Sequence, residues 1–204
     1  MIHIFKQGKK DNIYTFLALH GTGGDEKDLI PLANMIEPDV NVLSVRGNVL
    51  ENGMARFFKR KAPGVFDMES LEQETNNLRE FLKWASKEYG FDRDKVIALG
   101  YSNGANIAAN MLMRFDGVLF GAILLHPMVP NKEAKIPNMN NVKILITAGK
   151  MDRMVPYQDA VLLKEKFQEK NANVTLLSTN FGHQIVQEEV LAAQKFLKNS
   201  FEKN

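Results

Sequence analysis

The sequence feature that most restricts the possible fold class is a set of short apolar runs. Helical patterns alternate with these runs. The runs lie at residues 13–19, 42–45, 96–99, 121–125, 142–148 and 174–177. Several are nearly continuous in apolar residues, which is typical of strands buried on both faces of a parallel sheet. Helical patterns separate them at 69–89, 156–170 and 185–201. This alternation predicts an α/β fold, a mostly parallel sheet flanked by helices.

Length and composition favour one domain over residues 1–204 and exclude several classes of function. Lys and Arg number 26 against 24 Asp and Glu, a balance that argues against a nucleic-acid partner or an anionic membrane surface. The chain has no cysteine, so disulfides, thiolate zinc sites and a cysteine nucleophile are excluded together. This usage fits a reducing compartment.

The N-terminal segment and the hydropathy of the chain predict a cytoplasmic protein without membrane insertion. The first twelve residues, MIHIFKQGKKDN, lack the basic start and apolar centre of a secretory signal. No apolar run approaches the roughly 18 residues that a membrane span needs.

A serine between two glycines, in Gly100-Tyr101-Ser102-Asn103-Gly104, follows one apolar run directly. A small-residue segment with helical character comes next. The pattern can be a surface turn, or it can be an elbow that lifts a nucleophilic serine out of the sheet between a strand and a helix. Because both flanks are present and side chains at the two glycines would collide there, the sequence favours the elbow.

His183 is the best candidate for the base that such a serine needs. In this fold class the chain order is serine, then acid, then histidine, and only His183 lies downstream of a suitable acid. His3 lies near the terminus, while His20 and His126 each end an apolar run. These three histidines are interpreted as structural, with His20 ordering the loop that follows it.

Asp152 is the candidate acid, because it directly follows the apolar run 142–148. A loop at the carboxyl end of a parallel strand can aim a carboxylate at the site. Asp159, Glu165 and Glu169 fall instead within a helical pattern rich in lysine, which is typical of a solvated face.

Two backbone N–H groups, those of Asn103 and Thr22, are the candidate oxyanion hole. Asn103 follows the nucleophile at the start of a helix, whose dipole favours negative charge. Thr22 lies in the glycine-rich segment LHGTGGDEKDL after an early strand. That segment could instead cradle a phosphate, but the phosphate-binding spacings of glycine are absent. No cofactor and no metal is predicted.

Residues 45–68 show neither helical nor strand periodicity, and a loop of this length in a compact domain is usually functional. The candidate pocket residues are Phe57, Phe58, Phe66, Met68 and Met128. The aromatic residues and Met68 could equally well simply cover the sheet. Lys59, Arg60 and Lys61 are interpreted as a solvated charge run rather than an anion site. Residues 126–141 contain three prolines and no amphipathic period, which predicts a site without a helical lid.

The motifs together resemble a known family. The segments that carry the resemblance are LHGTGGDEKDLIPLA, VRGNVLENGMARFF, GYSNGANIA, LLHPMVP, ITAGKMDRMVP and GHQI. The chain is similar to the small carboxylesterase/phospholipase group of α/β-hydrolases, which is related to acyl-protein thioesterases, and within it to hydrolases of bacterial hydroquinone-resistance operons. The resemblance implies an α/β-hydrolase fold, a triad of Ser102, Asp152 and His183, and no metal. Homodimers are frequent in the group that it resembles. The thioesterase branch carries GFSQGG where this chain has GYSNGAN.

The predicted function is that of a serine carboxylesterase that hydrolyses small to medium carboxylic esters through an acyl-enzyme. Its partner is then a small-molecule ester. Two alternatives stay open: an acyl thioesterase or lysophospholipase, and a relative that binds ligands without turnover.

Overall fold

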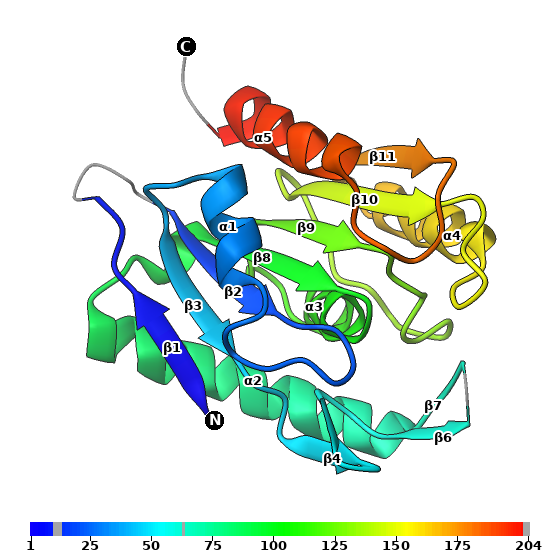
Figure 1. Ribbon diagram of the computed structural model, residues 1–204, viewed down its shortest axis with the longest axis horizontal. Coiled ribbons are helices and arrows are strands. Elements are labelled where there is room, and N and C mark those ends of the chain that lie inside the picture. Colours follow the sequence, from blue (N-terminus) through cyan, green and yellow to red (C-terminus); the bar gives the residue numbers. More distant parts are fainter. Residues whose placement is uncertain (10–13, 63, 202–204) are drawn as a thin grey trace.

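A seven-stranded sheet forms the centre of the part of the chain that the structure describes (Figure 1). The computed structural model describes residues 1–9, 14–62 and 64–201. The strand order is β1-β3-β2-β8-β9-β10-β11, and every pair is parallel except β1 with β3. The strands are β1 (His3–Lys6), β2 (Thr15–Leu19), β3 (Asn41–Val45), β8 (Val96–Tyr101), β9 (Gly121–Leu125), β10 (Lys143–Gly149) and β11 (Asn173–Thr179). The predicted mostly parallel α/β sheet is confirmed.

Helices cover both faces of this sheet. On one face lie α1 (Ile30–Ile36) and α5 (Gln187–Phe201), and on the other lie α2 (Met68–Tyr89), α3 (Asn103–Arg114) and α4 (Tyr157–Gln168) (Figure 1). Successive side chains of a strand point to opposite faces, so Phe16 and Ala18 pack with α1 and α5, while Leu17 and Leu19 pack with α2 and α3. This double coverage explains why the runs are continuously apolar.

Some element boundaries differ from the prediction. The first predicted run began at Ile13, which lies outside the described residues, and β2 begins at Thr15. Ser70 and Gln73 have the spacing of a capping box, but α2 begins earlier because the Asp67 side chain accepts the N–H of Ser70. Neither β1 nor α1 was predicted, because both are short and α1 has no side-chain cap.

The segment 45–68 is not the irregular loop that the sequence analysis predicted. It forms two antiparallel hairpins, β4 (Val49–Glu51) with β5 (Met54–Arg56) and β6 (Arg60–Ala62) with β7 (Val65–Phe66). Asn52 and Gly53 connect the first hairpin with φ values of 52° and 79°. An Asn-Gly pair between short strands is a strong hairpin signal, and the sequence carries this signal at Asn52 and Gly53.

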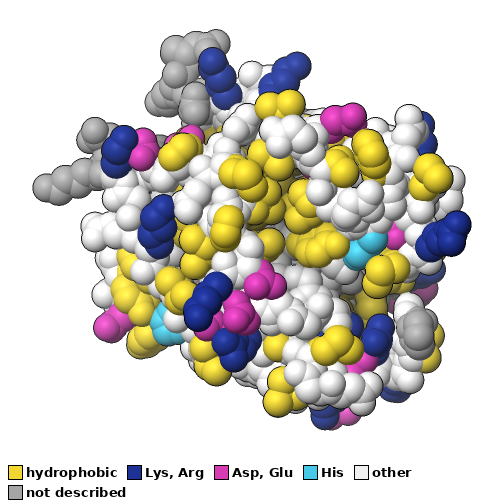
Figure 2. Space-filling view, viewed as in Figure 1, with side chains coloured by type: hydrophobic (Ala, Val, Ile, Leu, Met, Phe, Trp, Pro, Cys, Tyr) yellow, Lys and Arg dark blue, Asp and Glu magenta, His cyan; other side chains and the backbone are white. Residues whose placement is uncertain are grey.

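The described residues of the connection 126–141 contain no helix or strand, as expected of a site without a helical lid. No described helix is both long and apolar enough to cross a lipid bilayer. Figure 2 shows Lys and Arg side chains interspersed with Asp and Glu on the face in view, rather than gathered into one basic patch.

Candidate active site

Ser102 occupies a sharp turn between β8 and α3. Its backbone has φ 51° and ψ −112°, a conformation that non-glycine residues rarely adopt. A Cβ on Gly104 would overlap the carbonyl oxygen of Leu19, and one on Gly100 would lie 2.7 Å from Ala105. The two glycines therefore allow α3 to start against the ends of β2 and β8, and the turn holds the serine side chain above the sheet.

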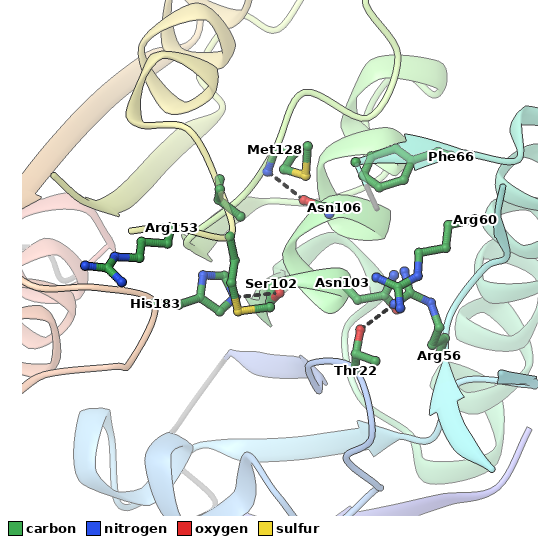
Figure 3. A pocket seen from close by; sticks show the side chains of 13 residues that line it. Thr22, Arg56, Arg60, Phe66, Ser102, Asn103, Asn106, Met128, Arg153 and His183 are labelled. Carbon is green, nitrogen blue, oxygen red and sulfur yellow. Dashed lines mark hydrogen bonds between the residues drawn. The ribbon is translucent and has the colours of Figure 1, made fainter. Parts of the chain in front are cut away.

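Three side chains from separate loops form a hydrogen-bonded chain at this turn, and Figure 3 shows two of them, Ser102 and His183. The Oγ of Ser102 lies 2.9 Å from Nε2 of His183, and Nδ1 of His183 lies 2.6 Å from Oδ2 of Asp152. An ionised carboxylate only accepts hydrogen bonds, so Nδ1 carries the proton and Nε2 is free to accept the one from Ser102. The three predicted residues are thus brought together in the geometry of a nucleophile, a base and an orienting acid.

The loop after β10 fixes the Asp152 carboxylate. Its Oδ1 accepts the backbone N–H groups of Met154 at 2.8 Å and Val155 at 2.9 Å. Burial alone would raise the pKa of Asp152, but the hydrogen bonds from His183 and these two N–H groups outweigh it and lower the pKa. The carboxylate is therefore ionised and held in one orientation.

The candidate oxyanion donors, Thr22 and Asn103, line the same cavity as Ser102. Asn103 is the first residue of α3, where a backbone N–H has no intrahelical acceptor. Among described residues, the N–H of Thr22 donates to none. The side chains of both residues are anchored: Thr22 Oγ1 accepts from Nη1 of Arg56 at 2.6 Å, and Asn103 Oδ1 accepts from the N–H of Phe57 at 2.7 Å.

A cavity of about 310 Å³ opens above Ser102 (Figure 3). It is lined by Thr22, Arg56, Arg60, Gly64, Phe66, Ser102, Asn103, Asn106, Met128, Arg153, Met154, Val155 and His183. Of the predicted pocket residues, Phe66 and Met128 line this cavity. The prediction is wrong for Phe57 and Phe58, which are fully buried in the core beneath it, and for Met68, which is 43% exposed at the start of α2.

The remaining histidines have distinct surroundings. His20 orders its loop as expected, since Nδ1 donates to the Gly21 carbonyl at 2.6 Å and Nε2 accepts the N–H of Gly47 at 3.0 Å. The ring of His3, on the edge strand β1, contacts the hydroxyl of Tyr89 at 2.7 Å.

His126 lies beneath the candidate triad. Its Nδ1 is 3.4 Å from Oδ2 of Asp152, and its Nε2 is 2.9 Å from Oε1 of the buried Glu189. Within the described residues, His126, Asp152 and His183 are the group whose donor atoms are close enough to hold a metal ion. The bond between His183 and Asp152 already accounts for this clustering.

Comparison with known proteins identifies the family. The profile of the phospholipase/carboxylesterase family matches residues 6–201. The chain belongs to this family. It is 44% identical over 200 residues to the Bacillus subtilis (strain 168) protein MhqD, named as a hydrolase, with 98% of this chain and 99% of that protein covered.

Solved structures of similar proteins agree with this membership in the phospholipase/carboxylesterase family. A Bacillus cereus carboxylesterase shares 47% identity at a TM-score of 0.96, with 98% of this chain and 94% of that chain covered. YahD, solved with malic acid, shares 35% identity at a TM-score of 0.91, with 98% of each chain covered. These similarities support a hydrolase of the esterase type on an α/β-hydrolase fold.

Four polar residues at the site were not predicted as site residues from the sequence. They are His126, Glu189, Arg56 and Arg60. Glu189 reads as an ordinary first-turn acid of a helix, and only the packing of α5 on the sheet buries it. Arg60 stands between two lysines and was assigned to a solvated charge run, whereas its side chain lines the cavity. Alternation along the short strand β6 could have separated Arg60 from Lys61, had the hairpin been recognised.

Proposed function

We propose that this protein is a serine carboxylesterase that hydrolyses small to medium esters through an acyl-enzyme. The observation that carries the proposal is the hydrogen-bonded chain from Ser102 through His183 to Asp152, which ends at a cavity. A volume of about 310 Å³ is near the lower end for ligand pockets, which favours small and medium substrates over long acyl chains.

In the proposed reaction, Nε2 of His183 accepts the proton of Ser102 while Oγ attacks the ester carbonyl carbon. The N–H groups of Thr22 and Asn103 donate to the oxyanion. The imidazolium then gives its proton to the leaving alcohol, which departs and leaves an ester on Ser102. A water molecule, deprotonated by His183, attacks this acyl-enzyme, and the proton returns to Oγ as the acid leaves. Asp152 stabilises the positive charge on His183 in both halves.

Labelling with a fluorophosphonate probe tests the nucleophile. The unaltered protein should be labelled at one serine, and Ser102→Ala should abolish both labelling and ester hydrolysis. Ser86→Ala is the matched control, because Ser86 lies on α2 and its hydroxyl donates to the Lys83 carbonyl of the same helix. If the unaltered protein hydrolyses no ester and Ser102 takes up no probe, the alternative of ligand binding without turnover replaces this proposal.

Substrate scope separates the ester function from the alternatives of thioester and lysophospholipid hydrolysis. Matched oxygen esters, thioesters and lysophospholipids should be compared by kcat/KM, and the oxygen esters of short acids should rank first. Since one solved relative was determined with malic acid, the comparison should include esters that carry a carboxylate.

A further inference from the structure

One wall of the cavity consists of hydrogen-bond donors that the protein itself leaves partly unused. The side chain of Arg56 is only 4% exposed. Its Nη1 donates to Thr22 Oγ1 at 2.6 Å and its Nε to the Phe58 carbonyl at 3.3 Å. Arg60 donates through Nε to Oε1 of Glu51 at 2.6 Å. Among described residues, no hydrogen-bond acceptor meets Nη2 of Arg56 or either terminal nitrogen of Arg60.

Asn103 adds a neutral donor to the same wall. Its Oδ1 is occupied by the Phe57 N–H, while its Nδ2 is buried and has no partner in the described part of the chain. Buried polar groups in folded proteins are nearly always hydrogen-bonded, and an unmet donor is destabilising. A ligand that supplies acceptors would remove this penalty.

The charge of the wall is positive. Arg56 and Arg60 share one carboxylate, that of Glu51, at 3.5 Å and 2.6 Å, so one positive charge of the pair is uncompensated. Among the described residues that line the cavity, none is an Asp or Glu. Glu51 meets both guanidinium groups through Nε, so their terminal N–H groups suit a second planar group with two anionic oxygens, which can accept several N–H bonds at once.

The position of the wall indicates which part of an ester would meet it. His183 must reach the leaving oxygen to protonate it, so the alcohol part lies on the His183 side of Ser102. Figure 3 shows Ser102 between His183 and the Arg56–Arg60 pair, and the bond from Arg56 to Thr22 places that pair next to the candidate oxyanion hole. The donor wall therefore faces the acyl part.

We propose that this wall binds a carboxylate on the acyl group, and that the substrates are monoesters of short dicarboxylic acids. This inference rests on the proposed esterase function and names its substrate class. The free carboxylate of the acyl group accepts from Arg60, Arg56 and Asn103 Nδ2, while the ester carbonyl lies against Ser102.

A pair of esters of the same shape tests whether this wall binds a carboxylate. Monomethyl glutarate carries the carboxylate, and its monoamide carries a neutral carboxamide at the same position. Methanol release should give a kcat/KM about 10- to 100-fold higher for the acid, the range expected of hydrogen bonds to a charged group. Arg60→Gln should lower this acid-to-amide ratio about tenfold. In Lys61→Gln, which removes the same charge from an exposed neighbour outside the cavity, the ratio should stay within twofold.

Binding of free glutarate gives a readout that does not depend on turnover. Calorimetry on Ser102→Ala should detect glutarate, and adding Arg60→Gln should weaken its binding about tenfold, whereas Lys61→Gln should not. Two results would refute carboxylate binding by this wall and leave the esterase function standing. One is Ser102-dependent hydrolysis without preference for the acid, and the other is a decrease in the ratio for Lys61→Gln as large as that for Arg60→Gln. If no ester is hydrolysed and Ser102 is not labelled, the proposed esterase function is wrong. If Ser102→Ala binds no glutarate, carboxylate binding by this wall is refuted independently.

Discussion

Replacing Asp152 by Asn should remove most activity through the tautomer of His183. The two backbone N–H groups of Met154 and Val155, at 2.8 and 2.9 Å from Oδ1, require an oxygen there. An asparagine must therefore keep its carbonyl oxygen on that side and turn its NH₂ toward Nδ1 of His183. That nitrogen becomes an acceptor, Nε2 then carries the proton, and His183 can no longer take the proton of Ser102.

The size of the effect follows from these contacts. Rotating the side-chain amide of the Asp152→Asn variant by about 180° would restore the productive tautomer of His183. It would also leave the N–H groups of Met154 and Val155 facing an NH₂ group. Each unsatisfied N–H costs about 1–3 kcal/mol, or roughly 2–6 kcal/mol for the two. That range alone corresponds to a loss in kcat of roughly 30-fold to 10⁴-fold. The negative charge that stabilises the imidazolium is lost as well, so we expect the upper end, about 10⁴-fold.

Steady-state hydrolysis of p-nitrophenyl butyrate measures this loss, and thermal unfolding of the same samples checks the fold. Glu165→Gln is the control, because Glu165 is an exposed acid of α4 that lies between Asp152 and His183 in the sequence. Its activity should match that of the unaltered protein. An Asp152→Asn protein that folds and keeps its kcat within fivefold would refute the role given to the carboxylate.

Three further results are expected. Phe57→Ala should lower the free energy of unfolding by about 3–5 kcal/mol in urea titrations, since Phe57 is fully buried, while Met68→Ala should change it by less than about 0.5 kcal/mol. Burial lowers the pKa of His20 below its ordinary value, so the unfolded chain takes up the proton first as the pH falls below about 6.5. The free energy of unfolding should therefore decrease between pH 7.5 and pH 5.5, and His20→Asn should make that decrease smaller. In a series of neutral p-nitrophenyl esters, kcat/KM should rise by up to about fourfold per methylene and stop rising between roughly four and eight carbons; a steady rise to palmitate would indicate a deep acyl channel.

The sheet and the hydrogen-bonded chain at the site could be predicted because each leaves a local signal. Continuous apolar runs follow from burial on both faces, and the elbow follows from two glycines that must admit a close approach at Leu19 and Ala105. The partners of Ser102 could be found because parallel strands end at one edge, so the loops after β8, β10 and β11 meet there.

The direction in which a side chain points was much harder to predict. Phe57 and Phe58 are adjacent in the sequence and apolar, which fits a pocket wall as well as a core, and both prove to be core residues. Arg60 and Lys61 are adjacent and basic, yet only Arg60 lines the cavity. Such differences depend on the course of the β6–β7 hairpin, whose two-residue and three-residue strands carry little periodic signal.

The distribution of charge around Ser102 matches the charge separation of the proposed reaction. On one side lies the ionised Asp152, with the buried Glu189 below it; burial raises the pKa of Glu189, but contacts with His126 and Thr147 outweigh it and lower the pKa. On the other side lie the candidate oxyanion donors and the positively charged wall of Arg56 and Arg60. In the proposed reaction, positive charge forms on His183, on the side of Asp152 and Glu189. Negative charge forms on the substrate oxygen, on the side of Arg56 and Arg60. Both charges are therefore stabilised by groups that are already in place, with no reorganisation at the moment of reaction.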